Sequence, residues 1–214
     1  QYVKPYVKTH KNDLRDAEAI AEAVTRPSMR FVPIKNVEQQ DIQALHRVRE
    51  RLIGARTALI HEIRGLLAEY GIVLPVGIKA FRQALVERLD TEQAKLTPLS
   101  AELFRKLREE IEKFDREIAS YDEKLQAMAT THPESQRLLT IPGIGPLTAT
   151  ALLAAVSDVI VFKNGHQFAA WLGLVPTQHS TGGQTRLLGI SKRGGSYLRK
   201  LLIHGARATL RWAK

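Results

Sequence analysis

The chain has 214 residues and is 44% hydrophobic, which is enough to build the core of one large domain or of two small ones. Its net charge of +10 favours a polyanionic partner, because each Lys or Arg placed on a phosphate releases condensed counterions. We expect this partner to be nucleic acid rather than a membrane surface, because no stretch of the sequence approaches the roughly 20 apolar residues that a membrane-spanning helix needs. The lack of cysteine excludes disulfides, thiolate zinc sites and cysteine nucleophiles, so any metal must be held by oxygen or imidazole.

The N-terminal part of the chain predicts a short strand followed by a helix. Residues 2–7 contain enough β-branched and aromatic residues for a strand, which a proline confines to the edge or end of a sheet. The run from Asp13 to Val24 is a strong helix former, and Asn12 or Asp13 can serve as its N-cap. No signal peptide is present, and Gln1 opens an ordered-looking sequence without an initiator Met, so we expect a fragment of an intracellular protein.

Asp13 and Asp16 form the first candidate site. Residues three apart on a helix lie on one face, where two carboxylates can share a divalent cation such as Mg²⁺ or Mn²⁺. The alternative is that Asp13 only caps the helix and Asp16 only compensates the helix dipole. Two-metal phosphoryl transfer needs more ligands than two carboxylates, so further acids would have to come from elsewhere.

Two long amphipathic helices are predicted in the middle of the chain. Between Val37 and Tyr70 leucines recur every seven residues and predict one helix. They are Leu45, Leu52, Leu59 and Leu66. After a break at residues 71–77, apolar residues follow the spacing of a coiled-coil seam, which predicts a helical hairpin or an intermolecular coiled coil. They are Phe104, Leu107, Ile111, Phe114, Ile118, Tyr121, Leu125 and Met128. The charged residues around this seam are interpreted as its solvated face.

The second candidate site is a glycine turn between two helical segments. Glycines and basic residues concentrate after Thr130, and we expect a second domain to start near Pro133. Within it, an apolar segment, a Pro-Gly-Ile-Gly turn and a small-residue helix at residues 146–156 have the pattern of a helix-hairpin-helix element. Gly143 and Gly145 would let the backbone approach a DNA phosphate in front of the N–H groups of the next helix. The alternative is an ordinary tight turn between helices.

The third candidate site runs from His179 to Arg186 and on through residues 189–195, before a helix predicted at residues 197–212. Small hydroxyl side chains, paired glycines and basic residues in so short a span suit a loop folded round a phosphodiester. The residues expected to bind DNA there are Arg186, Lys192, Arg193 and Arg199. The alternative is a loop that binds phosphate without catalysing a reaction.

This region contains three candidate nucleophiles, Ser180, Ser191 and Ser196, and their spacing alone does not show which of them attacks. A serine needs a base or a cation to become a nucleophile. Ser180 precedes two glycines that would let the backbone wrap close to a phosphate, with Arg186 and Lys192 stabilising its alkoxide. Ser191 suits phosphate binding or helix capping, and Ser196 fits an N-cap better still. His179 is adjacent to Ser180, but neighbouring side chains usually diverge, so we favour a surface or phosphate-contacting role over that of a base.

These motifs, in this order, resemble those of IS110-family transposases, specifically of the IS1111 subgroup. VKPYVKTHKNDLRDAEAIAEA resembles the end of that family's RuvC-like DEDD domain, and LLTIPGIGPLTATALLA with FAAWLGLVP resembles the start of its C-terminal transposase domain. HSTGGQTRLLGISKRGGSYLRKLLIHGARA resembles the core of the latter domain. The resemblance implies a Mg²⁺-binding RuvC-like domain, a coiled-coil segment for oligomerisation, and a serine that forms a covalent phosphoserine with DNA. It also implies a guide RNA encoded by the element, and a bacterial, cytoplasmic protein.

Carried over by residue, the resemblance assigns Asp13 and Asp16 to the last two acids of the DEDD set and Ser180 to the nucleophile. The first Asp and the Glu of that set have no counterpart here, because their strands would precede Gln1. We therefore expect this chain to be incomplete for catalysis and to hold Mg²⁺ or Mn²⁺ poorly. Thr181 stands where relatives of the subgroup commonly have a second serine, which leaves Ser180 as the only serine before the paired glycines.

The fold expected from these observations is mainly α, in three parts. They are a remnant of an α/β RuvC-like domain at residues 1–36, a long helical or coiled-coil hairpin at 37–132, and a C-terminal helical transposase domain with the helix-hairpin-helix element at 133–214. The expected function is DNA cleavage and rejoining by a homo-oligomer, a dimer or tetramer, that does not bind a membrane. The alternatives are a non-catalytic helix-hairpin-helix module that only grips DNA and a coiled-coil scaffold without affinity for DNA.

Overall fold

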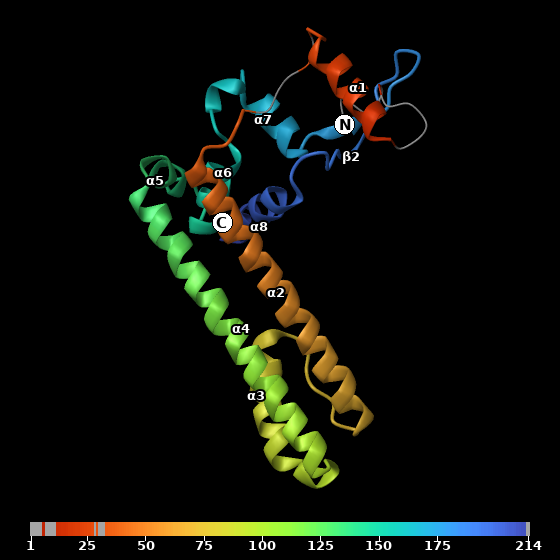
Figure 1. Ribbon diagram of the computed structural model, residues 1–214, viewed down its shortest axis with the longest axis vertical. Coiled ribbons are helices and arrows are strands. Elements are labelled where there is room, and N and C mark those ends of the chain that lie inside the picture. The colour runs from red at the N-terminus through yellow and green to blue at the C-terminus, as the bar shows by residue number, and fades with distance from the viewer. Residues whose placement is uncertain (1–5, 7–11, 28, 30–32, 213–214) are drawn as a thin grey trace. The chain divides into compact units, whose positions relative to one another are not determined.

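The computed structural model describes the whole chain except residues 1–5, 7–11, 28, 30–32 and 213–214. The described residues are mainly helical, as the sequence predicts (Figure 1). The chain divides into two compact units, Gln1–Ile34 and Lys35–Lys214, each of which is described by itself. None of the described helices is long and apolar enough to cross a membrane.

The first unit contains helix α1, Asp13–Val24, with the bounds that the sequence predicts. Asn12 is its N-cap, since the side-chain oxygen of Asn12 accepts a hydrogen bond from the backbone N–H of Leu14 at 3.0 Å. Ala19 and Ala23 are its buried residues. The strand predicted at residues 2–7 lies outside the described residues, apart from Tyr6.

The second unit is built on two long helices, α2 (Val37–Glu69) and α4 (Pro98–Thr131), which pack side by side (Figure 1). The ion pairs Arg49–Asp122 and Arg56–Asp115 join them. The residue number on α4 falls as the residue number on α2 rises, so the two helices are antiparallel. Helix α3, Ile78–Thr91, and a short 3₁₀ turn, Gln93–Lys95, connect them.

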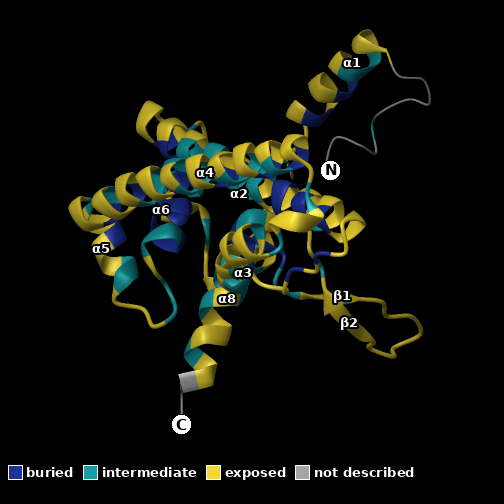
Figure 2. Cartoon of the chain, turned by 90° about the horizontal axis from the view of Figure 1, so that it is seen from below, coloured by how far each residue is buried: buried dark blue, intermediate teal, exposed yellow. Residues whose placement is uncertain are grey.

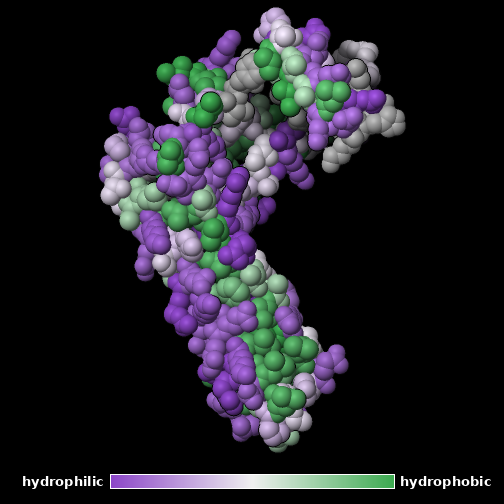
Figure 3. Space-filling model, in the orientation of Figure 1, coloured by the Kyte–Doolittle hydropathy of each residue, from purple (hydrophilic) through white to green (hydrophobic). Residues whose placement is uncertain are grey.

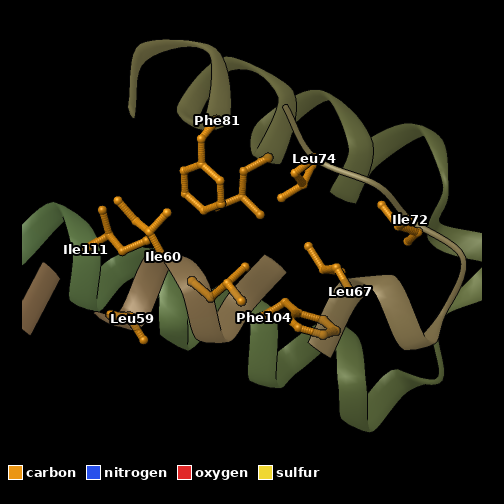
Figure 4. Close-up of a cluster of buried hydrophobic side chains, with 10 residues drawn as sticks. Leu59, Ile60, Leu67, Ile72, Leu74, Phe81, Phe104 and Ile111 are labelled. Atoms are coloured by element: carbon orange, nitrogen blue, oxygen red, sulfur yellow. The ribbon is translucent and has the colours of Figure 1, made fainter. Parts of the chain in front are cut away.

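The residues buried between these helices are those of the predicted repeat on α4, whereas on α2 the buried positions depart from the predicted seven-residue repeat. Every seventh residue of the α4 pattern is buried, namely Phe104, Ile111, Ile118 and Leu125. On α2, Leu52 and Leu59 are buried, whereas Leu66 is 37% exposed and its neighbour Leu67 is fully buried. A straight helix turns about 20° away from a seven-residue repeat with each heptad, which moves the interior position on by one residue. Figure 4 shows Leu67 in one apolar cluster with Leu59, Ile60, Phe81 and Phe104, which come from three helices.

The far end of α2 carries an exposed apolar area. Leu66 and Tyr70 are partly exposed there, and Val73 and Val76 in the following loop are exposed by 77% and 89%. Figure 3 shows a hydrophobic area at this end of the helix pair, bordered by hydrophilic residues.

The remainder of the second unit carries the predicted glycine turn and the segment with Ser180. Its elements are α5 (Pro133–Leu139), α6 (Pro146–Ala155), a 3₁₀ turn (Val159–Val161), α7 (Gly165–Leu172), strands β1 (Pro176–Gln178) and β2 (Leu187–Ile190), and α8 (Ser196–Trp212). Helix α6 packs against α2, α4, α5 and α8. Gln39 of α2 holds its C-terminal end, because the Gln39 side-chain nitrogen donates to the carbonyl oxygens of Leu153 at 3.0 Å and Val156 at 3.1 Å.

Two details of the last segment differ from the sequence expectation. Residues expected to form a loop around Ser180 belong instead to an antiparallel hairpin of β1 and β2. Helix α8 begins at Ser196, and the Gly195 carbonyl accepts from the N–H of Arg199 at 3.1 Å, so Gly195 occupies the position before the helix. The prediction that Ser196 is the N-cap is wrong by one residue, because the serine is already inside the first turn.

Candidate functional site

The hairpin that carries Ser180 turns at the paired glycines. Thr181 and Gln184 form a bridge, and the Gln184 N–H donates to the Thr181 carbonyl at 3.1 Å. Gly182 and Gly183 between them have φ values of 59° and 79°. Positive φ at both central positions is the geometry of a type I′ turn, which matches the twist of a two-residue hairpin. The glycines are therefore needed by the turn itself, whether or not a phosphate lies near them.

The register of this hairpin divides its side chains between two faces. Gln178 pairs with Leu187, and the His179 N–H donates to the carbonyl of Arg186 at 2.9 Å. Alternation along a strand therefore places Gln178 and Ser180 on one face and His179 and Arg186 on the other. Two observations agree with this division. The Gln178 side-chain nitrogen donates to the Ser180 hydroxyl oxygen at 2.8 Å, and His179, Arg186 and Leu188 line one shallow depression.

The hairpin is open to solvent over its whole length beyond the first strand residues. Every residue from 178 to 190 is exposed, and Figure 2 shows this hairpin in yellow, the colour of exposed residues. The Ser180 hydroxyl is thus accessible to a ligand as large as DNA. Arg186 and His179, the neighbours expected from the sequence to act on Ser180 or beside it, face away from it in this hairpin.

The basic segment after the hairpin packs its backbone tightly on the end of α7. The Lys192 N–H donates to the Gly173 carbonyl at 3.0 Å, and Lys192 has a φ of 54°, in the region that favours glycine. A Cβ at Gly194 would lie 2.2 Å from the Trp171 carbonyl oxygen, so only glycine fits there. Ser191 has its hydroxyl oxygen buried without a hydrogen-bond partner. This segment therefore holds Lys192 and Arg193 at the surface on a rigid support.

Arg199 differs from the other three basic residues predicted to bind DNA. Arg186, Lys192 and Arg193 are exposed, whereas Arg199 is half-buried. Its Nη1 atom donates to the carbonyl oxygens of Leu172 at 3.2 Å and Gly194 at 3.1 Å. The guanidinium thus ties α8 to the end of α7, and this structural role was not anticipated.

The two glycines of the predicted helix-hairpin-helix turn have different surroundings. A Cβ at Gly143, where φ is 88°, would lie 2.7 Å from the Gly205 carbonyl oxygen and 2.6 Å from the Thr209 hydroxyl. Gly143 therefore lets the turn pack directly on α8. Gly145 has a φ of −97°, precedes α6 as its N-cap, and has no atom within 4 Å of a built Cβ. It lies at an open surface in front of the first N–H groups of α6.

Asp13 and Asp16 lie in the first turn of α1, as predicted, with Asp13 exposed and Asp16 half-buried. They belong to the first unit, whereas Ser180 and the basic residues belong to the second. Among the residues that the structure describes, no three His, Asp or Glu side chains come together as a metal site. The pairing of Asp13 and Asp16 as metal ligands therefore stays a prediction.

A buried polar link among α2, α6 and α8 escaped sequence reasoning. The Thr150 hydroxyl donates to the Pro146 carbonyl at 2.7 Å, so its oxygen accepts from Nε2 of His46 at 3.0 Å, and Nδ1 of His46 accepts from the Tyr197 hydroxyl at 2.9 Å. Burial, and to a smaller extent the nearby charge of Arg49, lower the pKa of His46 to about 4, against an opposing contribution from Glu50. His46 is thus neutral at pH 7 and joins α2, α6 and α8. No local pattern marks it, since both partners lie more than 100 residues away.

Comparisons with known proteins relate both ends of the chain to transposases. Residues 135–214 match the model of the transposase IS116/IS110/IS902 family, and residues 1–72 match a second family model, described as a transposase. A probable family 20 transposase of Pseudomonas aeruginosa is 53% identical over 212 residues, which are 99% of this chain and 63% of that protein. The transposase for insertion sequence element IS1111A of Coxiella burnetii is 52% identical over 214 residues, which are 100% of this chain and 59% of that protein.

A third relative agrees with these two and shows the same difference in length. The transposase for insertion sequence element IS1328 of Yersinia enterocolitica is 42% identical over 209 residues, 97% of this chain and 61% of the relative. The chain thus spans 59% to 63% of the length of these relatives.

Proposed function

The chain belongs to the IS116/IS110/IS902 family of transposases, and from this membership we propose that it takes part in moving an insertion sequence by cleaving and rejoining DNA. The observation that carries the proposal is the exposed hydroxyl of Ser180, on a hairpin that is followed by a rigid basic segment. DNA supplies the polyanion that the net charge of +10 calls for.

In the proposed reaction Ser180 is the nucleophile. Its oxygen forms a bond to a DNA phosphorus, the bond from that phosphorus to the departing strand breaks, and the departing oxygen takes up a proton. The serine proton leaves to water. Lys192 and Arg193, fixed at the surface by the backbone contacts with α7, bind the phosphates on either side and hold the duplex in place.

The acids belong to a metal site that this chain supplies in part. Asp13 and Asp16 would hold Mg²⁺ or Mn²⁺ together with further carboxylates, and the ion would stabilise charge on the phosphate oxygens when bound. The described residues contain these two carboxylates and no third ligand near them.

Three further parts of the proposal concern the oligomer, the guide RNA and the binding of DNA phosphates. The exposed apolar residues at the end of α2, namely Leu66, Tyr70, Val73 and Val76, support a homo-oligomer whose subunits meet at this end of the helix pair. A guide RNA is proposed from family membership alone. The Gly145 turn is proposed to act as a helix-hairpin-helix element, in which the N–H groups at the start of α6 bind a DNA phosphate without reading sequence.

The nucleophile is tested with a DNA substrate that carries a nick near the scissile bond, so that a covalent intermediate is trapped. In the full-length protein with Mg²⁺, Ser180→Ala should abolish the covalent protein–DNA adduct and leave DNA affinity nearly unchanged, whereas Ser191→Ala should change neither, because the Ser191 hydroxyl is buried. Peptide mapping of the wild-type adduct should find the phosphate on Ser180. An adduct that persists in Ser180→Ala and disappears in Ser191→Ala would reverse the assignment.

The phosphate-gripping turn is tested at Gly145 and not at Gly143. Gly145→Asp places a carboxylate in open space before α6, so DNA affinity should fall by a similar factor on unrelated sequences while the melting temperature barely changes. Gly145→Ala is the matched control and should bind as the wild type does. Equal affinity of both variants would make the turn a structural connection only.

A non-catalytic DNA-binding module is the second candidate function. The observation in its favour is that Arg186 and His179 face away from Ser180, so the hairpin alone brings no cation or base to the hydroxyl. On the nicked substrate such a module would bind DNA in a salt-dependent manner and form no adduct in wild-type protein.

A further inference from the structure

A glutamine side chain, that of Gln178, holds the hydroxyl of Ser180. Gln178 ends β1, two residues before Ser180, and the register places both side chains on one face of the hairpin. The Gln178 side-chain nitrogen donates to the Ser180 oxygen at 2.8 Å. A primary amide has two N–H groups, and here one of them is directed at the atom that would attack.

We propose that Gln178 is a positioning residue for Ser180, one that fixes the serine rotamer and stabilises negative charge on its oxygen as the hydroxyl proton leaves. The inference rests on the proposed nucleophilic role of Ser180. A hydrogen bond is stronger when its acceptor is ionised than when it is neutral, so the amide favours the alkoxide over the hydroxyl. Because the serine oxygen is already an acceptor, its own O–H hydrogen points away from Gln178 and toward the incoming base or water.

The opposite face of the hairpin makes this assignment specific. His179 and Arg186 line a depression on that face with Leu188, so neither supplies the hydrogen bond that Gln178 makes. Their positions suit a neighbouring phosphate, which Arg186 can contact while Ser180 faces the scissile one. The hairpin thus presents an attacking face with Gln178 and Ser180 and a binding face with Arg186.

The chain offers a matched control in Gln184. Gln184 is also an exposed glutamine of the hairpin, but it pairs with Thr181 at the turn, on the face opposite Ser180. Replacement by methionine keeps the length and volume of either side chain and removes the amide donor. Gln178→Met and Gln184→Met therefore differ only in which face loses its amide.

The test measures the rate of adduct formation on the nicked DNA substrate, in the full-length protein with Mg²⁺, at saturating DNA and across pH 6 to 10. We expect Gln178→Met to lower the rate constant on the order of tenfold, because one donor to a developing oxyanion is lost from an exposed site. The loss should be of similar size at every pH in this range, because a serine hydroxyl stays protonated throughout it with or without the amide. DNA affinity should stay unchanged, and Gln184→Met should match the wild type in rate and pH profile.

The outcomes separate the two proposals. If the wild type forms no adduct, or forms it on another residue, the proposed function fails before Gln178 is considered. If the wild type forms the adduct on Ser180 and Gln178→Met keeps its rate and pH profile, the positioning role is wrong. An equal loss in both glutamine variants, or a loss that follows DNA affinity, would also overturn it, because the effect would then belong to hairpin structure.

Discussion

The helix pair and the serine hairpin lie in the same unit but are stabilised in opposite ways. Along α4 every seventh residue from Phe104 to Leu125 is buried, and Phe104, Ile111 and Leu125 belong to apolar clusters shared with other helices. Along the hairpin every residue from 178 to 190 is exposed, and its conformation depends on backbone register and a glycine turn. The difference teaches that apolar periodicity locates the scaffold, whereas hydrogen-bond register decides which side chains of the candidate site can act together.

The largest expected effect is on the buried seam. Ile118 is 6% exposed, and Ile118→Lys should lower the free energy of unfolding by about 4 kcal/mol, since a charge would be buried without a partner. Ala119→Lys, one residue along on the exposed side of α4, is the control and should change it by less than about 0.5 kcal/mol. Urea denaturation measures both. Sedimentation measures the oligomeric state of the folded protein. An oligomeric state that is unchanged in Ile118→Lys would argue that the seam acts only within the chain.

The next effect concerns the buried link at His46, which joins α2, α6 and α8. The folded-state pKa is lowered to about 4 from an ordinary 6.5, so between these values the unfolded chain binds a proton that the folded chain does not. Stability is therefore lost as pH falls from 6.5 toward 4, by at most about 3 kcal/mol. His46→Gln should flatten this part of the stability profile relative to wild type. Parallel profiles for the two proteins between pH 7 and 4 would exclude a neutral, buried His46.

Sequence reasoning found the elements that depend on local patterns and missed those that depend on distant partners. The bounds of α1 and the seam on α4 followed from helix signals and periodicity. The hairpin was expected as a loop, because its strands are short and lack alternating apolar residues. The pairing of Gln178 with Ser180 and the separation of Arg186 from both follow only from the register, which a glycine turn sets and a sequence pattern does not show.

The smallest expected effect tests the register itself. Gly183 has a φ of 79° and a built Cβ meets no atom within 4 Å, so Gly183→Ala costs only the backbone strain of a left-handed residue, roughly 1 kcal/mol. Because the hairpin is exposed, this cost should open the turn locally and hardly change the global melting temperature. Asparagine tolerates positive φ far better, so Gly183→Asn should keep the turn.

Amide hydrogen exchange at Gln184, whose N–H donates to the Thr181 carbonyl, measures the opening of the turn directly. We expect faster exchange in Gly183→Ala than in Gly183→Asn and, with it, slower adduct formation at Ser180. If exchange quickened in the alanine variant while adduct formation kept its wild-type rate, the two-faced register would be irrelevant to the attacking serine.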